Sequence, residues 1–292
     1  MSPNGKKVLI SGASSGIGLA TAHLMSEQGY HVVGLCRDVE KGYTFQKDLK
    51  RKKIFDLIEC DFKDSISRDQ AWLQIKEKIS SVDILINNAG YGEMSTLEEA
   101  SSQKSHELFE ANYFGHVDFI QKALPYMRHQ KNGIIINIGS VVYEAQFPFK
   151  AHYCAVKSAL SSMTLSLRYE VAPLGIRVHL VEPGWVRSHF HQNIDIQKTQ
   201  ISDYENRMLA LTDFSQDHNP RIPSCNKVAQ IIIKTIQNKN SPARIPIGKD
   251  SAKARWIKRL LGYSALDKLI LKRLAIKYRQ TPCQNSTSYV SS

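Results

Sequence analysis

The chain has 292 residues, of which 42% are hydrophobic and 23% charged, a composition that argues against a wholly disordered protein. Apolar runs stay well short of the roughly 18 residues that a membrane-spanning helix needs, and the first one is too short for a secretion signal. Five scattered cysteines without a CxxC pair favour a reducing, cytoplasmic location over a disulfide framework or zinc module.

The formal net charge of +12 is concentrated near the C-terminus. Residues 241–292 hold 11 of the 39 Lys and Arg residues but 2 of the 27 Asp and Glu residues. A nucleic-acid-binding domain is expected to carry a basic stripe across its folded body, so we expect no nucleic-acid partner. The asymmetry instead predicts a basic C-terminal element that meets an acidic surface.

Short apolar runs and helical stretches alternate along the first 180 residues. We predict strands at residues 7–11, 31–35, 54–59, 84–86, 134–138 and 177–181. We predict helices from Leu19 to near Gly29 and at residues 65–80, 103–128 and 153–172. This alternation predicts an α/β protein with βαβ units, a parallel sheet and right-handed crossovers. Residues 185–225 are polar and irregular, with weak helical signals at 202–211, and residues 281–292 form a polar tail that we expect to be flexible.

A glycine-rich loop joins the first predicted strand to the first predicted helix. Its glycines permit a tight turn and a close approach of backbone N–H groups to a pyrophosphate, and the helix adds its positive dipole end. The spacing is GxxxGxG rather than GxGxxG, and a glycine-rich turn without a ligand is the alternative. The candidate cofactor-binding residues are Gly12, Ser14, Ser15, Gly16, Ile17 and Gly18.

The end of the second predicted strand bears on which dinucleotide would bind. This strand runs into Cys36, Arg37 and Asp38, so an arginine rather than a carboxylate follows its tip. A guanidinium pairs with a 2′-phosphate, whereas a carboxylate accepts a hydrogen bond from a ribose 2′-hydroxyl. The sequence therefore favours NADP(H) over NAD(H). In the alternative interpretation, Arg37 is a solvated loop charge and Asp38 reaches the ribose.

Tyr153 and Lys157 lie one turn apart on one face of a predicted helix. An ammonium beside a phenol favours the phenolate and lowers its pKa, which suits acid–base chemistry. An isolated pair of this kind is also compatible with an aromatic ring packed on a lysine stem.

Polar residues follow two other predicted strands, at the sheet edge where ligands bind. Ser140 comes after the strand at 134–138, where its hydroxyl would hydrogen-bond a substrate carbonyl, and Asn88, Ala89 and Gly90 come after the strand at 84–86. Asn112 lies in the middle of a predicted helix, where asparagine is disfavoured, and a structural kink is the alternative to a functional role.

Taken together and in this order, these motifs resemble the short-chain dehydrogenase/reductase family over residues 6–190. The matching positions are Gly12, Gly16, Gly18, Asp61, Asn87 to Gly90, Asn112, Ser140, Tyr153, Lys157, Pro183 and Gly184. The resemblance implies one doubly wound Rossmann-fold domain of about seven parallel strands, with hydride transfer between a nicotinamide and a carbinol or carbonyl carbon. We place this domain at residues 1–250 and a helical extension at 251–280.

The resemblance also implies a role for each matching side chain. Tyr153 acts as general acid or base, Lys157 lowers the Tyr153 pKa and holds the nicotinamide ribose, and Ser140 orients the substrate oxygen. Asn112 supports a water that relays protons to Lys157, and Asp61 contacts the adenine. Ser188 stands where the family usually has threonine. The other implied cofactor-lining residues are Phe62, Asn88, Ala89, Gly90, Pro183, Gly184 and Val186. No metal is implied, and His189 and His191 lack the third ligand that a metal site requires.

The chain length and the residues around Tyr153 resemble the hydroxysteroid and retinol dehydrogenase branch of the family. These residues are Pro148, Phe149, Ser158, Ala159 and Leu160. The resemblance implies a lipophilic alcohol or ketone and a substrate lid at residues 185–225. The lid's apolar residues either face such a ligand or pack in the core, and they are Trp185, Phe190, Met208, Leu209, Leu211 and Phe214.

Residues 253–279 alternate apolar and basic residues in a helical pattern that breaks near Gly262. Such a helix pair lies on an anionic membrane surface, covers the substrate pocket, or docks on the domain with a solvated basic face. The third interpretation is favoured.

The function that these motifs favour is an NADP(H)-dependent oxidoreductase for a secondary alcohol or ketone. The alternatives are a 3-oxoacyl reductase acting on carrier-linked substrates, a nonenzymatic NADP(H)-binding protein, and a peripheral membrane adaptor. The family resemblance further implies a homodimer paired through the helices at 103–128 and 153–172.

Overall fold

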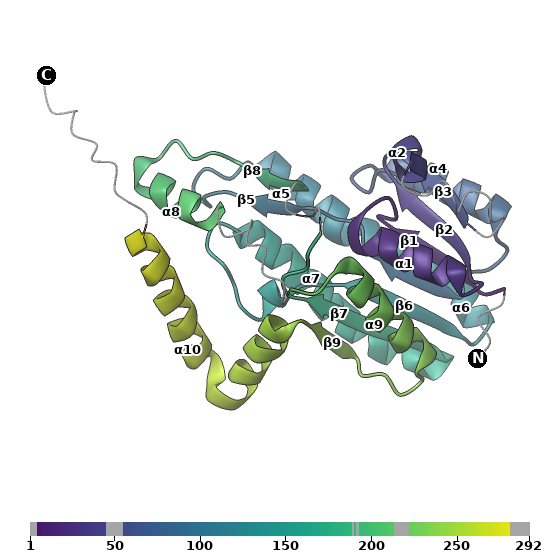
Figure 1. The fold of residues 1–292 in the computed structure, drawn as a ribbon. Helices are drawn as coiled ribbons and strands as arrows, with labels where there is room; N and C mark the ends of the chain where they lie inside the picture. Colours follow the sequence, from purple (N-terminus) through teal and green to yellow (C-terminus); the bar gives the residue numbers. More distant parts are fainter. Residues whose placement is uncertain (1–4, 45–54, 189, 191–192, 213–221, 281–292) are drawn as a thin grey trace, which may run out of the picture.

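Seven parallel strands form the central sheet of the protein in a computed structural model (Figure 1). The structure describes residues 5–44, 55–188, 190, 193–212 and 222–280. The sheet has the order β3-β2-β1-β4-β6-β7-β9. Its strands are β1 (Lys7–Ser11), β2 (His31–Cys36), β3 (Phe55–Glu59), β4 (Ile84–Asn87), β6 (Gly133–Ile138), β7 (Ile176–Pro183) and β9 (Arg244–Ile247). The chain therefore has the doubly wound Rossmann fold predicted from its sequence.

Helices cover both faces of this sheet. On one face, α1 (Gly16–Glu27) packs beside α9 (Cys225–Gln237), and both contribute buried apolar side chains to one core cluster. On the other face lie α4 (Ser65–Lys78), α6 (Gly115–His129) and α7 (Ala151–Val171), which contribute to a second cluster. Because the sheet is covered on both sides, its strands are short continuous apolar runs, and every residue of β6 is buried.

Two asparagines in this apolar sheet are joined by a hydrogen bond. Asn87 of β4 and Asn137 of β6 are register partners, and Asn87 Nδ2 donates to Asn137 Oδ1 at 2.8 Å. Asn137 Nδ2 in turn donates to the hydroxyl of Thr164 on α7 at 2.8 Å. This chain of hydrogen bonds ties the middle of the sheet to the helix that carries Tyr153 and Lys157.

The remaining elements, apart from one 3₁₀ turn that precedes β7, surround the carboxyl edge of the sheet. They are α2 (Val39–Thr44), β5 (Gly92–Met94), α5 (Ser102–Phe109), the π-helical η1 (Glu110–Phe114), the 3₁₀ turns η2 (Val141–Tyr143) and η3 (Ala172–Leu174), β8 (Ile194–Ile196), α8 (Ser202–Thr212) and α10 (Lys249–Gln280). Strands β5 and β8 pair in a separate two-stranded sheet. This small sheet joins the segment after Gly90 to the predicted lid.

All six predicted strands lie in the sheet within two residues of their expected limits, but several other elements were not predicted. The predicted helix at 103–128 is divided into α5, η1 and α6, with the π-helical turn at residues 110–114. Helix α9 and the edge strand β9 were not predicted. Strand β9 has four residues and contains Pro246, which an edge strand tolerates but which weakens the sequence signal.

Candidate active site

The predicted site residues meet at the carboxyl edge of the sheet, where the strand order reverses between β1 and β4. The hydroxyl of Ser11 accepts hydrogen bonds from the backbone N–H groups of Asn88 at 2.8 Å and Ala89 at 2.9 Å. Asn88 Nδ2 donates back to the carbonyl oxygens of Ser11 at 3.1 Å and Gly12 at 3.2 Å. These bonds fix the glycine-rich loop against the segment that follows β4. Ser11 was not singled out from the sequence.

The glycines of the loop are required by its geometry. Gly12 has a φ of +67° and Gly16 a φ of +58°, which disfavour other residues. At Gly18, a Cβ would lie 2.1 Å from the carbonyl oxygen of Gly12, so helix α1 and the loop can approach only without a side chain. The cap residue Ser15 makes no side-chain capping bond, which leaves the first N–H groups of α1 for an anion. This cradle fits the pyrophosphate of a dinucleotide.

Arg37 and Asp38 follow β2 directly beside the glycine-rich loop, and both side chains are exposed. The loop is held there because Ala13 N–H donates to the carbonyl oxygen of Leu35 at 3.0 Å. A Cβ on Gly42 of α2 would lie 3.5 Å from Ser14 Cβ, so Ser14 borders the same corner. Arg37 is therefore placed beside the glycine-rich loop with its side chain exposed.

Ser140, Tyr153 and Lys157 are brought together in a buried group. Their residues are 9%, 8% and 5% exposed, respectively. Ser140 caps η2 by accepting a hydrogen bond from Val142 N–H at 3.3 Å, and its side chain is hydrogen-bonded with Tyr153. Lys157 Nζ lies 6.0 Å from the centre of the Tyr153 ring and donates to the carbonyl oxygen of Ile138 at 3.1 Å. The end of β6 and helix α7 thus hold three polar side chains at one point.

Burial controls the protonation of this group. It raises the pKa of Tyr153 above its ordinary value, while the hydrogen bond with Ser140 acts in the opposite direction. Burial also lowers the pKa of Lys157 to about 8. Loss of hydration is the largest effect on the pKa of Tyr153 in this structure, and the lowering of that pKa by Lys157 stays a prediction. The protonated phenol is thereby favoured, which suits a general acid.

Asn112 lies inside the π-helical turn η1 and is completely buried. Its Nδ2 donates to the carbonyl oxygens of Leu108 at 3.0 Å and Tyr91 at 3.3 Å, while its Oδ1 has no hydrogen-bond partner among the described residues. A Cβ on Gly90 would lie 2.3 Å from this Oδ1, so Gly90 and Asn112 are in close contact. Single π-helical turns occur frequently at functional sites, and Asn112 occupies such a turn beside the predicted cofactor residues.

One buried histidine of this region was not indicated by the sequence. His116, one turn after Asn112, is buried, and its Nε2 lies 2.8 Å from the carbonyl oxygen of Ala89. Burial lowers the pKa of His116 to about 3, so its imidazole is neutral.

The side chain of Phe62 stacks on Phe119 in the core with ring centres 5.1 Å apart, so only its backbone is available to a cofactor. Asp61 Oδ1 accepts from Lys63 N–H at 3.0 Å.

The end of β7 supplies another wall of the predicted site. Gly184 N–H donates to the carbonyl oxygen of Ile247 at 2.9 Å, and a Cβ at Gly184 would lie 2.1 Å from Asp250 Oδ2. The same Asp250 oxygen accepts from Trp185 N–H at 2.8 Å. Asp250, missed in the sequence, therefore fixes the turn that follows Pro183. Further along, Val186 is buried, and Ser188 Oγ accepts from Phe190 N–H at 3.2 Å.

The predicted lid is described in part. Phe190 lies beside Tyr153, with ring centres 6.2 Å apart, so an apolar residue of the predicted lid reaches the buried group of Ser140, Tyr153 and Lys157. Met208 is 4% exposed and Leu209 is 52% exposed, so the apolar residues of α8 divide between core and surface. His189, His191 and Phe214 lie outside the described residues. Within the described part of the chain, no group of His, Cys, Asp and Glu residues forms a metal site.

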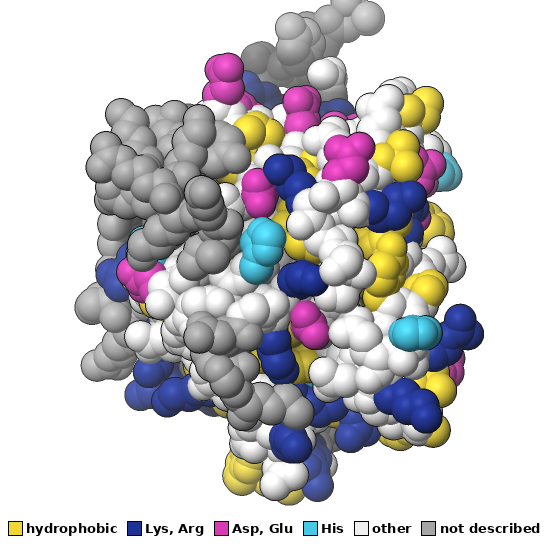
Figure 2. All heavy atoms as spheres, turned by 90° about the vertical axis from the view of Figure 1, so that its right-hand side faces the viewer, with side chains coloured by type: hydrophobic (Ala, Val, Ile, Leu, Met, Phe, Trp, Pro, Cys, Tyr) yellow, Lys and Arg dark blue, Asp and Glu magenta, His cyan; other side chains and the backbone are white. Residues whose placement is uncertain are grey.

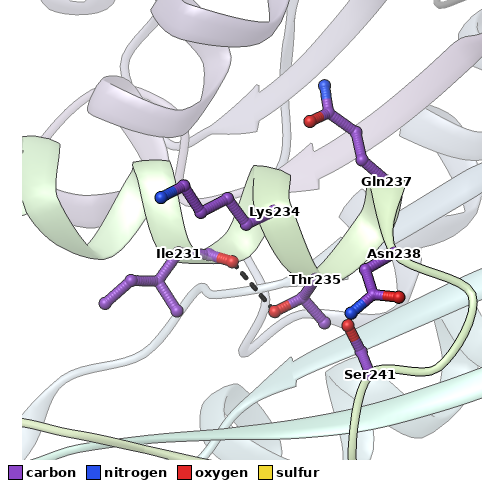
Figure 3. Close-up of a pocket in the computed structure, with 6 residues that line it drawn as sticks. All are labelled: Ile231, Lys234, Thr235, Gln237, Asn238 and Ser241. Carbon is purple, nitrogen blue, oxygen red and sulfur yellow. Dashed lines mark hydrogen bonds between the residues drawn. The ribbon is translucent and has the colours of Figure 1, made fainter.

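Figure 3 shows a different hollow, at the C-terminal end of α9. Its lining residues are Ile231, Lys234, Thr235, Gln237, Asn238 and Ser241. None of them belongs to the predicted site, and the hydroxyl of Thr235 donates to the carbonyl of Ile231 within the same helix. This hollow is therefore separate from the group around Tyr153.

A family model described as short chain dehydrogenase matches residues 6–199. The chain belongs to the short-chain dehydrogenase family. The match covers the glycine-rich loop, Ser140, Tyr153 and Lys157. Members of this family are oxidoreductases that use a nicotinamide cofactor.

Similar curated proteins include two reductases. A 3-ketodihydrosphingosine reductase of Bacteroides thetaiotaomicron is 34% identical over 243 residues, which are 82% of this chain and 87% of that protein. A 3-oxoacyl-acyl-carrier-protein reductase of Staphylococcus aureus is 33% identical over 217 residues, 73% of this chain and 86% of that protein. A solved short-chain dehydrogenase of Streptomyces avermitilis superimposes with a TM-score of 0.78 at 27% identity, covering 97% of this chain and 100% of that one.

Proposed function

We propose that this protein reduces a lipophilic ketone to a secondary alcohol with NADPH, using Tyr153 as the general acid. The observation that carries the proposal is the buried group of Ser140, Tyr153 and Lys157 beside the dinucleotide cradle. Burial keeps the Tyr153 phenol protonated, which is the form that a reduction consumes.

In the proposed mechanism, Ser140 Oγ and the Tyr153 hydroxyl both hydrogen-bond the substrate carbonyl oxygen. NADPH, when bound, supplies the hydride that adds to the carbonyl carbon. Tyr153 donates its proton to the oxygen as negative charge develops there, and the product is the alcohol. The ammonium of Lys157, held by the carbonyl of Ile138, stabilises the phenolate that remains. Asn112 supports the water through which Tyr153 and Lys157 recover a proton.

The preference for NADPH rests on Arg37. Its exposed side chain follows β2 beside Ser14 and the glycine-rich loop, where the 2′-phosphate of the cofactor would lie. Asp61, Asn88, Ala89 and Gly90 would line the adenine and ribose side of the same cofactor. Pro183, Gly184, Val186 and Ser188 would flank its nicotinamide.

A lipophilic substrate is supported by the apolar lid and by the printed activities of two relatives. Phe190 lies against the ring of Tyr153, so the reacting group would enter beside an aromatic side chain. The relatives are named as reductases of a 3-keto sphingoid base and of a carrier-linked 3-oxoacyl chain, which are both keto groups on long alkyl chains. Helix α10, which begins at Lys249, distinguishes our proposal from a carrier-linked reductase. The resemblance implies that carrier-linked reductases have chains that end before such a helix.

The test is a comparison of substrates and cofactors with the purified full chain. We expect NADPH oxidation with a long-chain 3-keto amine or a steroid ketone and little with a carrier-linked 3-oxoacyl chain. If the protein turns over only the carrier-linked substrate, the proposed reduction of a lipophilic ketone is wrong and the alternative 3-oxoacyl reductase function is favoured. Binding of NADPH without turnover of any ketone would favour a nonenzymatic NADPH-binding protein.

A homodimer through α6 and α7 is part of the same proposal. A groove on the outer faces of these helices is lined by residues of both, including Val117, Ala159 and Met163. Tyr169 on α7 is 74% exposed, which leaves an apolar ring for a second copy to cover. Light scattering should give a dimer for the chain and a monomer for Ala159→Arg. The cytoplasmic location and the limits of the domain at 1–250 and 251–280 stay predictions.

A further inference from the structure

Helix α10 is attached to the body through one of its faces. Ala254 and Leu266 are 8% and 4% exposed, and they pack with Val141 and Ala145 of the segment that follows Ser140. Gly262, with a φ of +80°, bends the helix between these two contacts. Figure 1 shows the resulting V shape, with α10 at the edge of the molecule remote from α4. The C-terminal extension therefore docks on the residues next to the proposed catalytic serine, as the favoured interpretation of the sequence expected.

Ion pairs reinforce this attachment. Arg244 of β9 contacts both Glu182 of β7 and Glu144 of the segment after Ser140, with Nη2 2.9 Å from Glu182 Oε1. From α10, Arg255 reaches Glu182 at 3.8 Å and Lys258 reaches Glu144 at 2.9 Å. Both glutamates are buried, so these cations are committed to the body. The attached side of α10 is thus defined by its apolar contacts and by two of its basic residues.

The other side of α10 is exposed and unusually apolar. Lys253, Trp256 and Leu260 share one face at spacings of three and four residues, and Trp256 and Leu260 are 64% and 56% exposed. The described part of the chain has fourteen large hydrophobic residues that are exposed, and six of them are on α10. These six are Trp256, Leu260, Leu261, Tyr263, Leu269 and Leu271. A solvated basic face, as the sequence analysis favoured, does not account for them.

Basic residues surround these exposed apolar side chains. Lys253, Arg259, Lys268 and Lys272 are exposed on the same helix, and Asp267 is an exposed acidic residue among them. The face of the molecule remote from α10 differs, since Lys and Arg lie interspersed with Asp and Glu in Figure 2. Exposed tryptophan and leucine flanked by Lys and Arg are typical of helices that lie in the interface of an anionic membrane. No helix of the described residues is long and apolar enough to cross a bilayer.

We propose that one exposed face of α10, defined as Lys253, Trp256, Arg259 and Leu260, docks on the surface of an anionic bilayer. Its apolar side chains enter the headgroup boundary and its basic side chains pair with lipid phosphates. Because the opposite face packs on the segment after Ser140, docking places the substrate side of the active site next to the membrane. Lipophilic ketone then reaches Tyr153 from the bilayer, a step that rests on the proposed function, whereas the docking itself does not.

The test is flotation of the full chain with vesicles of equal parts phosphatidylcholine and phosphatidylglycerol. We expect the chain to float with these vesicles, and to float at least about tenfold less with vesicles of phosphatidylcholine alone or in high salt. The double variant Trp256→Ser and Leu260→Ser should lose at least about tenfold of the binding. Its matched control is Ile66→Ser and Leu73→Ser on α4, because these side chains are 66% and 56% exposed and should leave binding unchanged.

A charge series complements the apolar one. Lys253→Gln with Arg259→Gln should weaken binding to the anionic vesicles, whereas Lys76→Gln with Lys227→Gln removes the same charge elsewhere and should have less effect. Equal losses in both pairs would mean that net charge alone drives binding, which contradicts a docking face. Failure of the full chain to float would overturn the proposal outright. If the wild-type chain is a dimer without vesicles and the Trp256→Ser and Leu260→Ser double variant is a monomer, the exposed face of α10 would be a dimer interface instead of a membrane-docking face.

Activity measurements separate this proposal from the proposed function. The Trp256 and Leu260 variant should reduce a water-soluble ketone at the unchanged rate, while its apparent KM for a ketone dissolved in vesicles should rise several-fold. Vesicle binding without any ketone reduction would support the docking face and contradict the proposed reaction. Ketone reduction without vesicle binding would support the proposed reaction and contradict the docking face.

Discussion

The side chains of Lys157 and Tyr153 share one buried site at the end of β6. Lys157 Nζ is 3.1 Å from the carbonyl oxygen of Ile138 and 6.0 Å from the centre of the Tyr153 ring. Burial acts on both groups, raising the pKa of the phenol and lowering that of the amine to about 8. Holding the charged Lys157 in this buried site costs folding free energy, and that cost can be measured.

Lys157→Met should abolish reduction and yet stabilise the protein. The pKa of Lys157 falls from 10.5 to about 8 on folding, so its charged form destabilises the native state by roughly 3 kcal/mol below pH 8. Between about pH 8 and 10.5 the folded amine is neutral while the unfolded one is still protonated, so this destabilisation disappears as the pH rises. Urea unfolding should therefore show the variant more stable at pH 7 and nearly equal at pH 10.5. A less stable variant at pH 7 would contradict this account of Lys157.

Arg37→Ala should weaken NADPH binding by about 10- to 100-fold and leave NADH binding unchanged. The expected loss corresponds to one hydrogen-bonded charge pair with the 2′-phosphate. Titration followed by nicotinamide fluorescence measures both affinities. Asp38→Asn is the matched control beside it and should change neither. A loss of NADH binding in Asp38→Asn would instead assign ribose recognition to Asp38.

Gly18→Ala should remove dinucleotide binding because its Cβ would lie 2.1 Å from the carbonyl oxygen of Gly12. Relief of this clash must move helix α1 or the loop, at a cost of about 1–3 kcal/mol in unfolding free energy. Gly262→Ala serves as the control, since nothing lies within 4 Å of its added Cβ and its φ of +80° adds strain alone. That control should lose about 1–3 kcal/mol through backbone strain alone and keep its affinity for NADPH. Equal affinities in the two variants would argue against the loop as the cofactor cradle.

Arg244→Met should destabilise the protein by about 3 kcal/mol at pH 8, because it leaves Glu182 and Glu144 buried without their shared cation. Burial and the neighbouring Glu144 raise the pKa of Glu182 to about 8, against the effect of Arg255. A protonated Glu182 carboxyl needs no cation, so the cost should shrink as the pH falls from 8 to 5. Lys258→Met, which removes a half-exposed partner of Glu144, should cost less than about 1 kcal/mol. Thermal unfolding of both variants across this pH range checks the difference.

The sequence predicted those parts of the fold and site that rest on local patterns. Short apolar runs located six strands because a sheet covered on both faces buries most of its strand residues. Helix α9 carried a usable signal that was overlooked, since Val228, Ile232 and Ile236 recur at spacings of four after the cap residue Ser224.

Contacts between distant residues could not be predicted in this way. Arg244 meets Glu144 across 100 residues and Glu182 across 62 residues, and no spacing rule joins them. The pKa of Tyr153 likewise depends on burial, which the spacing of Tyr153 and Lys157 does not reveal. The sequence indicated the reacting groups, whereas their protonation and the anchoring of α10 required the folded structure.

Transfer of deuterium from NADPH deuterated at C4 to a long-chain ketone tests the central claim most directly. Mass spectrometry of the alcohol should find the label on the carbinol carbon with the wild-type chain, using the C4 stereoisomer that the protein accepts. Tyr153→Phe, which keeps the ring but removes the proton, should bind NADPH normally and transfer label about 10³-fold more slowly. Label transfer at the wild-type rate by Tyr153→Phe would contradict Tyr153 as the general acid, and no label in the product with either C4 stereoisomer would contradict the reduction itself.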